Sequence, residues 1–92
     1  MKARPVLNEK RAHGRGFVQI VVWQVPRPVP PSDHGFKYRM VYVVDGVRRV
    51  GYDNERGKGD HRHIGDRELP YQWVDVATLI RDFWQDVLEA DR

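Results

Sequence analysis

The sequence predicts an α+β domain, in which an antiparallel sheet of four or five strands is covered on one face by a C-terminal helix. Three observations carry this prediction: strand-like runs at 17–25 and 36–44, an Asp-Gly dipeptide between two such runs, and a helical apolar stripe after Asp75. With 92 residues the chain has the usual size of one domain, so residues 1–92 are treated as a single unit.

The strands are recognised by composition and alternation. Residues 17–25 read FVQIVVWQV, are rich in β-branched and aromatic residues, and end at a cluster of four prolines. Residues 36–44 alternate with the period of two that is typical of a strand, whereas residues 4–11 are only weakly patterned. Asp45-Gly46 predicts a two-residue hairpin turn, which leads into a further strand at 47–53.

The hairpin turn also predicts a register. If Val44 faces Val47, counting back pairs Met40 with Gly51 and Arg39 with Tyr52. One face at the open end of the hairpin would then carry four polar groups, unless a bulge shifts the pairing by one residue. These groups are Lys37, Arg39, Tyr52 and Asn54.

The end of the chain predicts a long connection followed by a helix. Residues 55–71 contain three glycines and alternating charges, and we expect a long loop of the kind that either carries function or is disordered. Asp75 is a suitable N-cap for a helix that reaches about Ala90. Its apolar stripe should pack on the sheet. We expect burial of Ile20, Val21, Met40, Tyr42, Leu79, Ile80 and Phe83.

Composition excludes several classes of chemistry. The chain has no cysteine, which rules out disulfides, thiolate nucleophiles and cysteine-zinc sites. Its apolar runs are too short to cross a bilayer, and its charged first residues lack the apolar core of a signal peptide. We therefore expect a cytoplasmic protein with no membrane partner.

The charge is unevenly distributed along the chain. Residues 1–69 hold 14 Lys or Arg and 8 Asp or Glu, a net charge of +6, whereas residues 70–92 carry −3. A basic body of this kind suits a polyanionic partner such as RNA. The simpler alternative is that the charges only keep a small domain soluble.

The segment YDNERGKGDHRH, at residues 52–63, concentrates the reactive side chains. If it is extended, His61 and His63 point to the same side, with a spacing of about 6.6 Å along the strand. Imidazoles suit both proton transfers of metal-free RNA cleavage, because their pKa lies near neutrality. We therefore predict His61, His63, Lys58, Asp60 and Asp53 as catalytic residues, with no cofactor.

The same scheme needs groups that hold the substrate. Cations stabilise the phosphate charge, glycines let backbone amides approach it, and aromatic rings stack on bases. The predicted substrate-binding residues are Lys37, Arg39, Tyr52, Asn54, Gly57, Gly59 and Arg62.

Three other interpretations of the segment are left open. The histidines could simply be exposed residues of a polar loop. The His-x-His pair could chelate zinc or manganese, with Asp53, Asp60 or His34 as a third ligand, which would make a metal-dependent nuclease. The cationic surface could also bind nucleic acid or protein without cutting it. The sequence does not decide whether the chain forms a homo-oligomer.

Several motifs together resemble the TumE family of bacterial toxins. They are VVWQVPRPVP, FKYRMVYVVDG, YDNERGKGDHRHIGDRELPY and a closing helix that begins near VDVATLIRDFW, and they span nearly the whole chain. The resemblance implies the toxin of a two-gene toxin-antitoxin module, which acts on RNA and is neutralised by a helix-turn-helix antitoxin. It does not assign catalytic residues, so those named above rest on their chemistry alone.

Overall fold

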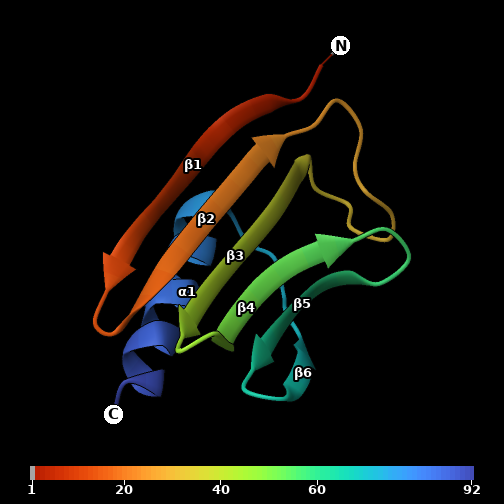
Figure 1. The fold of residues 1–92 in the computed structure, drawn as a ribbon. Coiled ribbons are helices and arrows are strands. Elements are labelled where there is room, and N and C mark those ends of the chain that lie inside the picture. Colours follow the sequence, from red (N-terminus) through yellow and green to blue (C-terminus); the bar gives the residue numbers. More distant parts are fainter. Residues whose placement is uncertain (1) are drawn as a thin grey trace.

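A computed structural model describes residues 2–92 as one six-stranded antiparallel sheet and one helix. The strands follow one another in sequence order across the sheet, and the helix crosses its back in the view of Figure 1. The elements are β1 Arg4–His13, β2 Gly16–Gln24, β3 Phe36–Val44, β4 Val47–Glu55, β5 Gly59–Ile64, β6 Arg67–Pro70 and α1 Val76–Ala90.

The predicted α+β class is correct, but the predicted number of four or five strands is wrong. The segment 55–71, expected to be a loop, forms two more hairpins through β5 and β6. These short strands are polar and lack a continuous apolar face. Backbone pairing, of β5 with β4 and of β6 with β5, therefore makes them strands, and this pairing is not visible in their own composition.

The β3–β4 hairpin turns as predicted but carries a bulge. Asp45 and Gly46 both have positive φ, 52° and 76°, and Val44 pairs with Val47. Arg49 is an extra residue in β4, because Val43 pairs with Arg48 while Tyr42 already pairs with Val50. The predicted pairings beyond this point are therefore wrong by one residue. The observed pairs are Met40 with Tyr52 and Arg39 with Asp53.

The hydrophobic core lies between α1 and one face of the sheet. Leu79, Phe83 and Val87 of the helix are buried against strand residues that include Ile20 and Met40. Asp75 is the N-cap, as predicted, and accepts a hydrogen bond of 2.7 Å from the backbone N–H of Thr78. Two expected core residues, Val21 and Ile80, are only half-buried. Val21 faces away from the helix, since its neighbours along β2 face toward it.

Tyrosine–carboxylate pairs hold the helix and loops to the sheet. Each buried ring meets the apolar core while its hydroxyl donates to an anionic acceptor, which is stronger than a neutral one. Burial and these acceptors raise the pKa of Tyr38 and Tyr52 well above the ordinary value. The pairs are Tyr38 with Asp60 (2.6 Å), Tyr42 with Asp91 (2.5 Å), Tyr71 with Asp82 (2.7 Å) and Tyr52 with Asp86.

The two faces of the sheet differ. The covered face packs on α1, and the open face, turned toward the viewer in Figure 1, meets no helix within residues 2–92. The proline-rich loop between β2 and β3 bends to the β4–β5 turn, where the N–H of Gly57 donates to the carbonyl of Pro30 at 2.8 Å. The part of the chain that the structure describes has no helix suited in length and apolarity to spanning a bilayer.

Candidate active site

Strand alternation brings Asp53, His61 and His63 together on the open face. Asp53 lies directly across from His61 in the β4–β5 pair, and Gly51 lies across from His63. The two imidazoles therefore project from the same side of β5, as predicted, with ring centroids 5.0 Å apart. Gly51 has no side chain, and the side chain of Arg48 lies over it. We call Asp53, His61 and His63 the open-face triad.

His61 is fixed in orientation within this triad. Its side chain is buried, and its Nδ1 lies 3.0 Å from the carbonyl oxygen of Gly59, which can only accept a hydrogen bond. Nδ1 therefore carries a proton, and in the neutral ring Nε2 presents a lone pair toward Asp53. Nε2 and Asp53 Oδ1 approach to 2.6 Å, yet neither atom has a hydrogen-bond partner among the described residues.

His63 is the more accessible imidazole of the triad. It is half-exposed, and its pKa is lowered mainly by partial burial and by the positive charge of Arg48. Arg48 projects from β4 beside it, since the aliphatic part of its side chain passes close to Gly51. A neutral imidazole is therefore favoured at this position near pH 7.

A Lys58–Glu68 ion pair borders the triad. Their side chains meet at 3.0 Å, and Glu68 also lies 3.9 Å from His61 Nε2. The hydrogen bond between them raises the pKa of Lys58 and lowers the pKa of Glu68. Glu68 escaped the sequence analysis. The missed signal was Gly65-Asp66, a two-residue turn that pairs His63 with Glu68 across β5 and β6.

Two further predicted residues lie on the open face. Arg39 is exposed and sits across from Asp53, and it forms no ion pair within residues 2–92. Lys37 is half-buried, and its ammonium donates to the backbone carbonyl of Asn54.

Asp60 does not join the triad. It precedes His61 in β5 and therefore points to the covered face, where it accepts hydrogen bonds from Ser32, His34 (2.7 Å) and Tyr38 (2.6 Å). Burial opposes ionisation of Asp60, but these three donors together lower its pKa. His34 also stacks on Trp73, with centroids 3.8 Å apart. Asp60 thus anchors the β2–β3 loop, and the two alternative metal ligands, Asp60 and His34, lie away from the triad.

Three predicted substrate-binding residues also belong to the covered face. Tyr52 and Asn54 are fully buried, because the bulge at Arg49 moved them there. Asn54 accepts from the Tyr38 N–H at 3.0 Å and donates to the Phe36 carbonyl at 2.8 Å. Arg62 forms an ion pair of 3.1 Å with Asp86 of the helix. The prediction that Tyr52 and Asn54 share a face with Lys37 and Arg39 is wrong.

The two glycines shape the β4–β5 turn. Gly57 and Gly59 have φ values of +87° and +80°, which favour glycine. A Cβ on Gly59 would lie 3.1 Å from Pro31, and the Gly57 amide is already bonded to Pro30. The Gly57 amide therefore serves the loop contact described above, and Gly59 lies close to Pro31 in the same loop.

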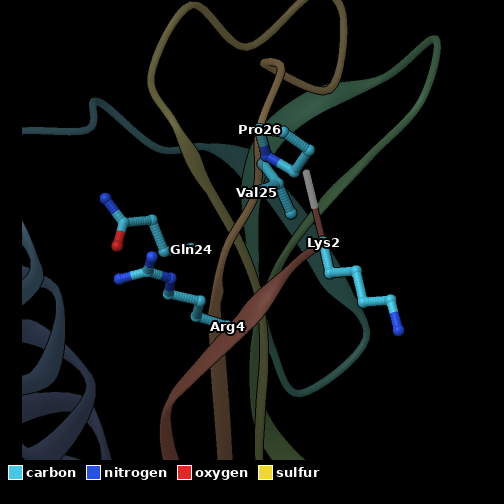
Figure 2. Close-up of a pocket in the computed structure, with 5 residues that line it drawn as sticks. All are labelled: Lys2, Arg4, Gln24, Val25 and Pro26. Carbon is cyan, nitrogen blue, oxygen red and sulfur yellow. The ribbon is translucent and has the colours of Figure 1, made fainter.

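A separate hollow lies between the start of β1 and the end of β2. It is lined by Lys2, Arg4, Gln24, Val25 and Pro26, which Figure 2 shows on either side of the strand end. None of the triad residues reaches it, and we assign the chemistry to the open face.

Comparison with known proteins gives a single result. A protein-family model described as Toxin TumE matches residues 3–91. Searches of curated proteins and of solved structures returned no match.

Proposed function

Because this chain belongs to the TumE toxin family, we propose that it is a toxin that cleaves RNA on the open face of its sheet. One observation carries the proposal. Two imidazoles and a carboxylate converge beside a Lys58–Glu68 pair on the face that also bears Arg39 and Arg48. A phosphodiester needs both kinds of group, cations for its charge and proton-transfer groups for its reaction.

The surrounding cations suit a single RNA strand. Arg39, Arg48 and Lys58 are exposed around the triad, at positions from which they can contact successive phosphates. Trp23, a half-buried residue, pairs with Lys37 on the same face and offers a ring on which a base can stack.

The reaction uses the nucleophile that RNA itself supplies, its 2′-hydroxyl. We assign Glu68, the exposed carboxylate beside the triad, as the base that accepts the proton of this hydroxyl. The 2′-oxygen then bonds to phosphorus, the bond from phosphorus to the 5′-oxygen breaks, and the leaving oxygen takes a proton from solvent. The products are a 2′,3′-cyclic phosphate and a 5′-hydroxyl.

This assignment changes the roles expected from the sequence. A scheme with His61 and His63 as base and acid requires both imidazoles to reach the RNA. His61 is only 4% exposed and its Nε2 faces Asp53, so His63 is the imidazole of the pair that can meet substrate. We therefore place proton transfer on Glu68 and leave His63 to contact the phosphate.

The test is cleavage of single-stranded RNA by the purified protein, with analysis of the product ends. Cyclic phosphate ends are expected, and replacing the 2′-hydroxyl by hydrogen at the cleaved position should stop the reaction. Arg67→Ala, on the last hairpin but outside the triad, is the control and should cleave normally. If the protein binds RNA at this face but never cuts it, the chain is a binding module and the proposal of an enzyme is wrong.

Membership in a toxin family also implies an antitoxin partner. We propose a helix-turn-helix protein that lays acidic groups over Lys58 and Arg48, which are exposed and stand on either side of the triad. Association should then weaken as salt is added, because exposed charges are screened. An affinity that is equal at low and high salt would indicate an apolar interface instead.

A further inference from the structure

We propose that the open-face triad binds one divalent transition-metal ion. Asp53, His61 and His63 each offer one ligand atom, and these atoms all lie within 4.8 Å of one another. Ligands of a tetrahedral ion with bonds of 2.0–2.1 Å are separated by roughly 3.3 Å. In the structure Asp53 Oδ1 and His61 Nε2 are 2.6 Å apart, and no pair of ligand atoms is separated by more than 4.8 Å. Small side-chain rotations would therefore bring the three atoms to the separation of about 3.3 Å that the ion requires.

Unpartnered polar atoms point to the same conclusion. Three buried side-chain atoms lack a hydrogen bond among residues 2–92, and two of them are Asp53 Oδ1 and His61 Nε2. Buried polar atoms are normally paired, and an exception calls for an ion or another partner. The two atoms lie 2.6 Å apart without a hydrogen bond between them. A cation placed between them and His63 would satisfy both.

The surroundings prepare His61 to act as a ligand. The carbonyl of Gly59 accepts from Nδ1 and leaves the Nε2 lone pair on the side of Asp53. This is the outer-shell contact by which metal-binding histidines are usually oriented. Gly59 is itself packed against Pro31, which keeps its carbonyl in place.

An ordinary His–Asp ion pair explains the geometry less well. In such a pair the Nε2 proton would be directed at the carboxylate, as the His34–Asp60 pair on the covered face shows with its hydrogen bond of 2.7 Å. The His61–Asp53 contact is as short but has no hydrogen bond. His63 would also have no role in a pair, although it is held beside His61.

The ligand set indicates the type of ion and its use. Two imidazoles and one carboxylate suit zinc, manganese or a similar ion, and three protein ligands leave a coordination position open. The open position lies on the uncovered face, where RNA would approach. The role of the ion rests on the proposed function: it would hold a non-bridging phosphate oxygen and neutralise the charge that develops there.

Metal binding can be measured without RNA. Tag-free full-length protein is dialysed against EDTA, transferred to metal-free buffer and titrated calorimetrically with Zn²⁺ and with Mn²⁺, and its Co²⁺ complex is examined by visible absorption. One ion per chain is expected. Asp53→Asn and His63→Ala should weaken binding by at least about 100-fold. His13→Ala, a histidine outside the triad, is the matched control and should bind as the wild type does.

Circular dichroism of each variant verifies that it is folded, and Asp53→Asn preserves the side-chain shape. A protein that binds neither ion, or variants that bind as tightly as wild type, would overturn the metal site.

RNA cleavage then separates this inference from the proposed function. Loss of cleavage after EDTA, restored by one equivalent of metal, supports both. Undiminished cleavage in EDTA overturns the metal role and leaves the nuclease. Tight metal binding without cleavage of any RNA leaves the metal site and removes the nuclease.

Discussion

Two His–Asp pairs lie in or beside the same hairpin, on opposite faces of the sheet, and they differ in how far their atoms are satisfied. On the covered face, the Asp60 carboxylate accepts from His34 at 2.7 Å and from two hydroxyls. On the open face, His61 and Asp53 meet at 2.6 Å, but the facing atoms have no hydrogen bond. Identical residue types thus build an anchor in one place and the proposed site in the other.

The difference teaches how a functional pair can be told from a structural one. Asp60 and His61 are neighbours in β5, so alternation alone sends them to opposite faces. Ser32 and His34 of the β2–β3 loop donate hydrogen bonds to the Asp60 carboxylate. No such donors reach Asp53 Oδ1 among the described residues, and this buried atom is left for a partner from outside the chain.

The largest expected effect is the loss of the anchor. Asp60→Ala leaves the donors of Ser32, His34 and Tyr38 buried without their acceptor, and should lower the free energy of unfolding by about 3 to 5 kcal/mol. Urea denaturation measures this. Asp53→Ala is the counterpart on the open face and should change stability by less than about 1 kcal/mol in metal-free buffer, since it removes an unsatisfied atom. An equal loss of unfolding free energy in the two variants would contradict the distinction between a structural Asp60 and an unsatisfied Asp53.

The next effect is on cleavage. Glu68→Gln keeps the side-chain size but removes the proton acceptor, and should lower the rate of RNA cleavage by about 100-fold or more. His63→Ala should lower it by about 100-fold as well, because it removes a ligand of the proposed ion that neutralises the phosphate charge. Asp66→Asn, an exposed acid in the same hairpin, is the control for Glu68. Single-turnover assays on a defined RNA give the rates, and a Glu68→Gln protein as fast as wild type would remove Glu68 from the reaction.

A smaller effect is the stabilisation that metal should give. An ion that binds only the folded chain should add about 2 kcal/mol when its free concentration is thirty times Kd. Thermal unfolding with and without Zn²⁺ measures it. Wild type and Ser32→Ala, a change confined to the covered face, should both be stabilised, and Asp53→Asn should not. Stabilisation of Asp53→Asn by the same amount would place the ion elsewhere.

The smallest effect concerns phosphate contacts. Lys58→Gln should weaken RNA binding a few-fold and reduce the slope of log affinity against log salt by about 0.7, the value for one single-stranded phosphate contact. Arg67→Gln is a charge-matched control with no expected change in slope. Filter binding of RNA at several salt concentrations measures both, and an unchanged slope for Lys58→Gln would remove it from the RNA surface.

Local signals in the sequence were enough for a good part of this architecture. The Asp45-Gly46 turn, the helix beginning after Asp75 and the shared side of His61 and His63 depend on residues close together in the chain, and all three predictions are confirmed. One inference was within reach and missed. If residues 60–63 are extended, Asp60 must face away from His61, so it could have been separated from the triad by alternation alone.

Other features were decided only by the tertiary structure. The bulge at Arg49 sends Tyr52 and Asn54 into the core and turns Asp53 toward His61, because the register of β4 depends on how its side chains pack across two sheet neighbours and a helix. The strands β5 and β6 exist through pairing, β5 with β4 and β6 with β5, and this pairing also places Glu68 beside the triad. The sequence by itself determined which residue types were present, and long-range packing decided which of them meet.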